Sequence, residues 1–311
     1  MSGVEGAATR PIDAVIARVR AVYGRWGRGT TVQQMRADWD RLFAAPPDLD
    51  ARVEPVDANG VPAEWISPPG EATDGAVLYF HGGGFQVGSL ASHRELMACI
   101  AAASGCRVLG VGYRLAPEHR YPAALDDART AYAWLLSRQR KGAASIALAG
   151  DSAGAGLALS LMLSLRDAGA PLPAAALLMS PWTDLSASGA SYETRADADP
   201  IHQRAMILAM ARGYLGKDGD ARVPYASPLF GQLSGLPPML VQVGDRETVR
   251  SDATDFVDKA CAAGVDARIE VWDDMIHVFQ QFPHDLAEAR QALQSAGAFL
   301  RARLSSPLRV R

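Results

Sequence analysis

A single serine stands among closely spaced glycines in the stretch ALAGDSAGAGLALSL, residues 147–161. Gly150 and Gly154 flank Ser152 in a G-x-S-x-G pattern, between the apolar run SIALAG and a long Ala/Leu-rich segment. Glycines at a junction between a strand and a helix permit a sharp turn that presents the intervening side chain. The pattern therefore predicts a serine nucleophile, and the alternative is an ordinary turn between a strand and a helix.

A serine hydroxyl is a poor nucleophile until a base takes its proton and a third group orients that base. The chain order expected for this strand–turn–helix context is serine, acid, histidine, and only His202, His277 and His284 follow Ser152. We favour His277, which stands just past the last apolar strand, because a loop at the carboxyl edge of the sheet can bring it over the serine. His202 falls in an inserted region, and His284 falls inside the final helical pattern.

Acyl transfer also needs hydrogen-bond donors for the oxygen that becomes negative. Three consecutive glycines, Gly82 to Gly84, follow the apolar run AVLYF and leave their backbone N–H groups unobstructed, and the N–H of Ala153 adds another from the serine turn. A phosphate-binding loop is the alternative. Its G-x-G-x-x-G spacing is missing, and no acidic residue follows the second strand at the ribose-binding position.

Compact apolar runs alternate with helical patterns along most of the chain. These runs are residues 76–80, 107–113, 145–150, 175–181, 239–244 and 267–272, and two short extended segments, 51–56 and 61–68, come before them. Such alternation predicts an α/β protein with a mostly parallel sheet covered by helices on both faces. The region 183–226 breaks the pattern and indicates an insertion above the sheet.

Two amphipathic helices are predicted before the sheet begins. Apolar residues recur at helical spacing from Ile12 to Tyr23, and a second helical stretch, TTVQQMRADWDRLFAA, ends at Pro46. Their apolar faces have no partner within their own segment, so we expect them to cover the acyl site. Trp26 and Trp39 either line an acyl pocket there or pack the helices together.

Composition excludes several classes of partner. The 311 residues carry 31 basic and 34 acidic side chains, well mixed, with a formal net charge of -3, so we expect no binding of nucleic acid or of an anionic membrane surface. We find neither a secretion signal nor an apolar run long enough to span a membrane. The three cysteines show no paired, metal-type spacing, and a reducing cytoplasm fits them best.

Three motifs in this order, HGGGF, YRLAPEHRYPAALDDA at 113–128 and GDSAG, resemble the hormone-sensitive-lipase-like family of α/β-hydrolases, the bacterial family IV esterases. The resemblance spans roughly residues 50–300. It implies an α/β-hydrolase fold with an eight-stranded sheet and a helical cap, no cofactor or metal, and hydrolysis of short- to medium-chain acyl esters. Family members commonly form homodimers through the sheet edge.

The resemblance also divides the chain and assigns roles to some residues. It implies an N-terminal helical cap segment at 1–46 and a catalytic domain at 47–311, with a cap insertion at about 185–222. By motif, Gly83, Gly84 and Ala153 form the oxyanion hole, and His81 helps hold that loop. The stretch YRLAPEHRYP, with Glu118, is interpreted as a buried turn and ion-pair element.

The acid is the least obvious member of the site. Asp245, Glu247 and Asp252 all follow a strand in VQVGDRETVRSDATDF, and the family usually places an aspartate in this loop. Helical spacing of the apolar residues that follow puts the helix start at Ser251 or Asp252, so Glu247 occupies the family's loop position while Asp245 sits earlier. Asp252 is explained as a first-turn carboxylate favoured by the helix dipole. We therefore predict Glu247 over Asp245.

The sequence as a whole predicts a cytoplasmic serine carboxylesterase in which Ser152, Glu247 and His277 form a triad and the substrate is a small-molecule ester. Two alternatives on the same fold stay open. One is a non-catalytic receptor for small ligands, although such relatives typically lose a triad member. The other is an amidase or peptidase that uses the same three residues.

Overall fold

The structure is a computed structural model and describes residues 10–304. Within them, eight strands form one sheet in the order β1-β2-β4-β3-β5-β6-β7-β8. β1 and β2 pair antiparallel, as do β2 and β4, and all other neighbours are parallel. The strands are β1 (Arg52–Asp57), β2 (Pro62–Ser67), β3 (Ala76–Phe80), β4 (Arg107–Val111), β5 (Ile146–Asp151), β6 (Ala175–Met179), β7 (Met239–Gly244) and β8 (Ala267–Trp272). The prediction of a mostly parallel eight-stranded sheet is thereby confirmed.

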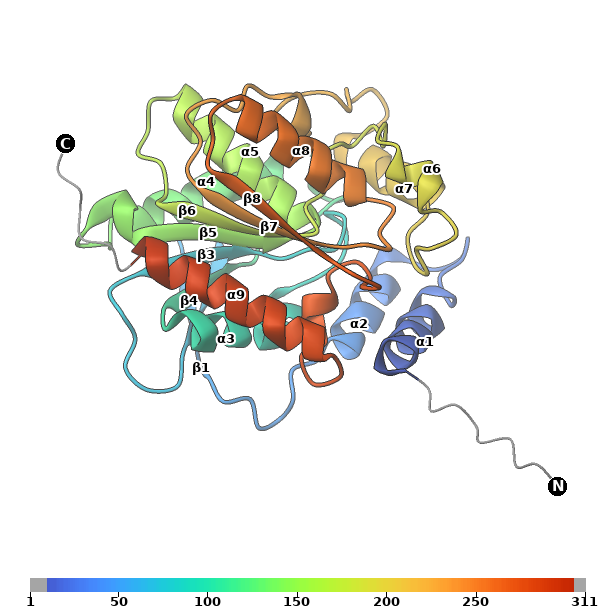
Figure 1. Ribbon diagram of the computed structural model, residues 1–311, viewed down its shortest axis with the longest axis horizontal. Helices are drawn as coiled ribbons and strands as arrows, with labels where there is room; N and C mark the ends of the chain where they lie inside the picture. The colour runs from blue at the N-terminus through green and yellow to red at the C-terminus, as the bar shows by residue number, and fades with distance from the viewer. Residues whose placement is uncertain (1–9, 305–311) are drawn as a thin grey trace.

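Helices cover both faces of this sheet (Figure 1). One face carries α3 (Leu90–Ser104) and α9 (Ala287–Leu304), and the other carries α4 (Ala123–Leu136), α5 (Ala153–Asp167) and α8 (Arg250–Ala262). The central strand β3 is buried along its whole length. Val77 belongs to the core between the sheet and α3 and α9, and Leu78 belongs to the core on the face of α4, α5 and α8. Side chains of a strand alternate between faces, so an apolar run with no polar alternation is what a doubly covered strand requires.

Two short helices precede the sheet, and two more interrupt the later part of the chain. They are α1 (Pro11–Tyr23), α2 (Val32–Leu42), α6 (Ser191–Thr194) and α7 (Arg204–Leu215), and all four gather at one end of the sheet (Figure 1). α1 buries Val15 and neighbouring apolar residues against Ile276 and Phe279, which follow β8. α2 begins with a capping box, in which Thr31 and Gln34 satisfy each other's backbone N–H groups.

The turn YRLAPEHRYP differs from its prediction, because its tip is exposed rather than buried. The carboxylate of Glu118 lies 2.7 Å from Arg36 on α2, and the same guanidinium donates to the backbone oxygens of Gln86 and Ala116. The turn reaches outward to hold α2, so the predicted ion pair is present while the predicted burial is not.

The interpretation of His284 also needs correction. α9 begins only at Ala287, after a turn in which the N–H groups of Asp285 and Leu286 both donate to Phe282 O. His284 therefore lies before the helix rather than inside it, where its exposed side chain contacts Glu95 at 2.5 Å.

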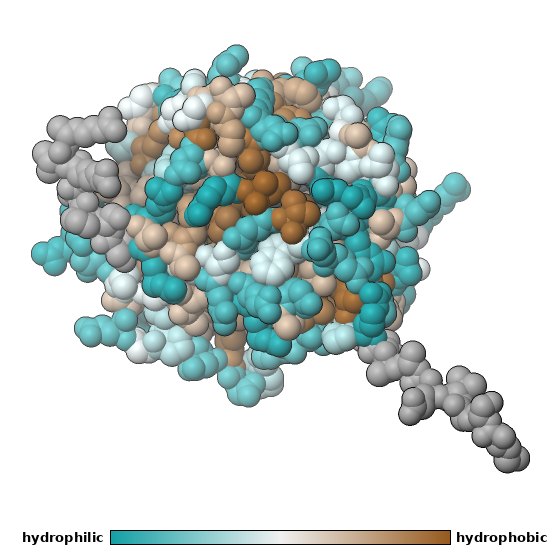
Figure 2. Space-filling view, in the orientation of Figure 1, coloured by the Kyte–Doolittle hydropathy of each residue, from teal (hydrophilic) through white to brown (hydrophobic). Residues whose placement is uncertain are grey.

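The remaining short helices are 3-10 turns, η1 (Gly142–Ser145), η2 (Pro228–Phe230) and η3 (Phe279–Gln281). None of the helices between residues 10 and 304 is both long and apolar enough to cross a membrane. Figure 2 shows apolar side chains at the surface over the edge strand β8, where Val271 is 38% exposed. Pairing of two copies through this edge stays a prediction.

Candidate active site

Ser152 occupies a sharp turn between β5 and α5. Its backbone has φ +50° and ψ -120°, a conformation that non-glycine residues adopt only under constraint. The constraint is steric and local, since a Cβ on Gly154 would lie 2.0 Å from Phe80 O and a Cβ on Gly150 would lie 2.6 Å from the Gly154 backbone. The flanking glycines thus allow the turn to pack against β3 while Ser152 faces outward into a pocket.

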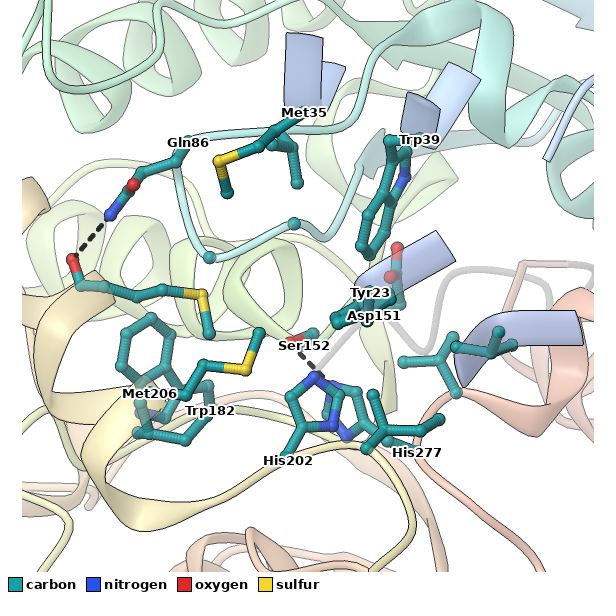
Figure 3. A pocket seen from close by; sticks show the side chains of 18 of the residues that line it. Tyr23, Met35, Trp39, Gln86, Asp151, Ser152, Trp182, His202, Met206 and His277 are labelled. Carbon is teal, nitrogen blue, oxygen red and sulfur yellow. Dashed lines mark hydrogen bonds between the residues drawn. The ribbon is translucent and has the colours of Figure 1, made fainter. Parts of the chain in front are cut away.

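His277 lies in the loop after β8, with its ring between Ser152 and Glu247. Its Nε2 is 2.8 Å from Ser152 Oγ, and its Nδ1 is 2.7 Å from Glu247 Oε2 (Figure 3 shows the first of these contacts). An ionised carboxylate can only accept, so Nδ1–H donates to Glu247 and Nε2 is left to accept the Ser152 proton. Burial lowers the pKa of His277, but the charge and hydrogen bond of Glu247 outweigh it and raise that pKa above 6.5.

Glu247 is fully buried in the turn between β7 and α8, and both of its oxygens are engaged. Oε1 accepts from Ser180 Oγ at 2.7 Å and from the Gly244 N–H at 2.5 Å. Ser180 also accepts the N–H of Val278, the residue after His277, at 3.1 Å. Ser180 therefore ties the acid loop to the histidine loop, a role that sequence reasoning missed.

Asp245, the alternative acid, lies elsewhere. Its carboxylate is 3.1 Å from Arg195 and 3.3 Å from Arg250, and about a third of its side chain is exposed. The structure brings Glu247 rather than Asp245 to His277. α8 begins at Arg250, one residue before the predicted start, which leaves Glu247 in the loop as expected.

The structure places Asp252 in the first turn of α8, as predicted, and adds contacts that the dipole interpretation does not include. Its Oδ2 accepts the backbone N–H groups of Thr183 and Asp184 at 2.9 and 2.8 Å. Burial, together with the nearby charge of Asp184, raises the pKa of Asp252 to about 8. The group is therefore mostly protonated at neutral pH, and it anchors the 183–184 backbone.

The glycine loop after β3 lies beside the Ser152 turn. Gly83 and Gly84 have φ of +111° and +60°, and a Cβ on Gly83 would lie 2.2 Å from Val87 O. Among the described residues, none accepts a hydrogen bond from the backbone N–H of Gly83, Gly84 or Ala153. These three donors are thus available beside the serine.

The buried carboxylate of Asp151 braces this loop. Its Oδ1 accepts from the Gly82 N–H at 2.9 Å and from the Tyr79 hydroxyl at 2.5 Å. Burial raises the pKa of Asp151. The charge of His93 and the hydrogen bonds that His93 and Tyr79 make to Asp151 outweigh burial, so this pKa lies below its usual range. His81 stacks on Tyr113 and contacts Gly82 O at 2.8 Å, in keeping with its expected part in holding the loop.

Ser152, Gly83 and Gly84 open onto a cavity of about 220 Å³ with a mostly apolar lining (Figure 3). The N-terminal helical segment and the insertion each contribute six lining residues. The N-terminal segment supplies Val19, Tyr23, Trp26, Met35, Trp39 and Phe43, and the insertion supplies Ile201, His202, Met206, Ile207, Ala209 and Met210. Trp26 and Trp39 also stack on each other with ring centres 6.5 Å apart, so they both line the pocket and pack the helices together.

The described part of the chain holds no cluster of His, Cys, Asp or Glu that could bind a metal ion.

The position of His202 in the pocket was not predicted. His202 lies with its ring centre 4.5 Å from that of His277, although sequence reasoning set it aside as part of the insertion.

Comparison with known proteins places these features in a family. A family model described as an alpha/beta hydrolase fold matches residues 77–281. An acetyl-hydrolase from Streptomyces hygroscopicus is 43% identical over 278 residues, which cover 88% of this chain and 91% of that protein. An esterase from Acinetobacter venetianus is 38% identical over 259 residues, which cover 83% and 84% of the two chains.

Solved structures agree. The crystal structure of an esterase from the bacterial hormone-sensitive lipase family superposes with a TM-score of 0.91 at 44% identity, over 96% of this chain and 100% of that one. A hormone-sensitive lipase from a metagenome library gives a TM-score of 0.89 at 33% identity, with the same coverage. The chain therefore belongs to the α/β-hydrolases, as an esterase of the hormone-sensitive lipase family that hydrolyses carboxylic esters.

Proposed function

We propose that this esterase cleaves short- to medium-chain acyl esters through Ser152, His277 and Glu247. Ser152 Oγ attacks the ester carbonyl carbon while its proton moves to His277 Nε2. The carbonyl oxygen becomes negative and accepts hydrogen bonds from the N–H groups of Gly83, Gly84 and Ala153. His277 then gives its proton to the leaving alcohol, and water attacks the acyl-enzyme by the same route.

The observation that carries this proposal is the unbroken line of hydrogen bonds from Glu247 through His277 to Ser152 at the base of the pocket. Both contacts are within hydrogen-bond reach, between 2.6 and about 3.2 Å, and the contact from Ser152 to His277 is the one along which the proton moves. Because Glu247 is fully buried, salt screens its interaction with His277 only weakly, and it can stabilise the imidazolium that forms when His277 takes the proton.

Pocket size supports the limit on acyl length. At about 220 Å³ the cavity is smaller than the roughly 300–1,000 Å³ typical of sites for drug-sized ligands. We infer that residues 1–46 and the insertion at about 185–222 form one cap over the catalytic domain at 47–311. Residues 1–9 of that segment lie outside the described residues, and the cap is argued from α1, α2, α6 and α7 alone.

A graded series of p-nitrophenyl esters, from acetate to dodecanoate, tests the proposal. We expect kcat/KM to peak at or below octanoate and Ser152→Ala to lower kcat by about 10⁶-fold. Ser164→Ala is the matched control, because that hydroxyl lies in α5 and donates to Leu161 O away from the pocket. A folded Ser152→Ala protein with more than a tenth of the parent activity would rule out Ser152 as the nucleophile.

A further inference from the structure

His202 lines the pocket but has no part in the proposed mechanism. Its ring meets that of His277 edge to face, at 71° between planes, and only 7% of the residue is exposed. Asp199 Oδ1 accepts its backbone N–H at 2.8 Å, and Asp199 Oδ2 accepts the N–H of Thr248, the neighbour of Glu247, at 2.8 Å. His202 is therefore held in place beside His277 by the same loop that carries Glu247.

The ring nitrogens of His202 lack partners. Neither hydrogen-bonds another described residue, and Nδ1 is fully enclosed. Three other nitrogen-bearing side chains of the pocket are paired, since Trp26 donates to Asp38, Trp182 to Asp184 O and Gln86 to Met210 O. A buried polar group without a partner is destabilising, so each case calls for an explanation.

Trp39 and Gln281 share this property. Each lines the same pocket and carries an enclosed nitrogen with no partner among the described residues. His202 differs from them in its position, because its ring lies against His277 (Figure 3). Of these three residues, it is the one placed to meet substrate atoms close to the reacting bond.

Charge decides what His202 can bind. Burial, with the neighbouring His277 as a smaller cause, lowers the pKa of His202 to about 4. At neutral pH the ring is therefore uncharged and offers one donor and one acceptor. An ether, hydroxyl or carbonyl oxygen matches such a ring, whereas a carboxylate would find no positive charge there.

Position decides which part of the substrate it meets. His277 Nε2 delivers the proton to the leaving alcohol, so the ester oxygen must come within hydrogen-bond distance of that nitrogen. The atoms of the alcohol next to the ester oxygen then lie beside the ring that packs on His277, 4.5 Å away between centres.

We propose that His202 is a specificity residue that hydrogen-bonds a second oxygen in the alcohol part of the substrate. The favoured substrates are thus esters of alcohols that carry an ether or hydroxyl oxygen two carbons from the ester oxygen. This inference rests on the proposed roles of Ser152 and His277. The alkyl chain of a simple alcohol would cover the His202 ring without forming a hydrogen bond to its nitrogens. A site built for a hydrogen bond discriminates against such analogues.

The test compares 2-methoxyethyl butyrate with n-butyl butyrate, which have equally long alcohol chains and differ by one oxygen in place of a methylene. Values of kcat/KM come from acid release in a pH-stat and are divided by each ester's rate of alkaline hydrolysis. We expect the wild-type enzyme to prefer the methoxyethyl ester by about 2- to 10-fold, the range of one neutral hydrogen bond. A corrected ratio near 1 in the wild type overturns the proposal without any variant.

His202→Phe, which keeps a ring and removes both nitrogens, is expected to bring the ratio to about 1. Met206→Leu is the control, because Met206 lines the pocket on the same segment without a hydrogen-bonding group. A His202→Phe enzyme with the wild-type ratio overturns the proposal, and His202→Met serves if the phenylalanine variant does not fold. Ser152→Ala separates the two failures, since an active Ser152→Ala enzyme refutes the proposed mechanism whatever the ratio.

Discussion

Exchanging Glu247 for glutamine tests the site most sharply, because the contacts of its two oxygens dictate how the new amide must lie. Oε1 accepts from both Ser180 and Gly244, so the amide oxygen has to take that position. The NH2 group then faces His277 Nδ1, 2.7 Å away, and donates to it. Nδ1 becomes an acceptor, the ring proton moves to Nε2, and Ser152 loses its base.

The size of the effect follows from this change of tautomer. An aspartate-to-asparagine exchange at the equivalent place in a serine protease triad lowers kcat about 10⁴-fold. We expect Glu247→Gln to do the same here, which corresponds to about 5 kcal/mol of lost transition-state stabilisation. The assay is kcat with p-nitrophenyl butyrate at pH 8, with circular dichroism as the check on folding.

Asp245→Asn is the matched control. Its carboxylate is partly exposed and pairs with Arg195 and Arg250, and exposed pairs of this kind contribute only about 0–1 kcal/mol. We expect its kcat to stay within about threefold of the parent. The reasoning fails if folded Glu247→Gln keeps more than a tenth of the parent kcat, or if Asp245→Asn shows the larger loss.

Three further outcomes are expected. The pH profile of kcat/KM should lose activity below a midpoint above 6.5, because Glu247 raises the pKa of His277, and a midpoint below 6 would contradict that assignment. Trp39→Ala removes a large part of the N-terminal pocket wall and should raise KM for p-nitrophenyl octanoate more than for the acetate, whereas equal changes would make that wall a packing element only. The folded-state pKa of Asp252 is about 8 against an ordinary 3.8, so the folded protein binds more protons than the unfolded chain between these values, and stability falls as pH rises through them. Asp252→Asn cannot ionise, so its Tm relative to the parent should rise by several degrees from pH 5 to pH 8, and a constant difference would refute the argument.

Local patterns were enough for the fold and for much of the site. β3 is a short run without polar alternation between Gly75 and His81, which is how a strand buried on both faces must look. Ser152 could be placed because a nucleophile turn is a local structure with glycines at fixed offsets. Glu247 could be preferred over Asp245 as the loop acid because helical periodicity sets the start of α8 within a residue, and that start decides which acid lies in the loop.

Contacts between distant parts of the chain could not be predicted in the same way. Ser180 hydrogen-bonds a residue 67 positions later, and Arg36 reaches Glu118 across 82 positions. Neither pair has a spacing that periodicity can detect, because the partners meet only once the separate elements have packed together. The exposed tip at Glu118 was misjudged for this reason, since the arginine that holds it belongs to a helix outside the sheet.

His202 shows what this limit means for function. The inserted segment has no strand pattern, so its side chains had no predicted position relative to His277. Asp199 supplies that position through two hydrogen bonds, one to the backbone of His202 and one to Thr248 beside Glu247. The loop of the proposed acid and the pocket wall thus share one anchor, so a change in the inserted segment can reach both the chemistry and the substrate preference. Substitutions at Asp199 should accordingly alter kcat and KM together, whereas substitutions at His202 should act on the choice between alcohols.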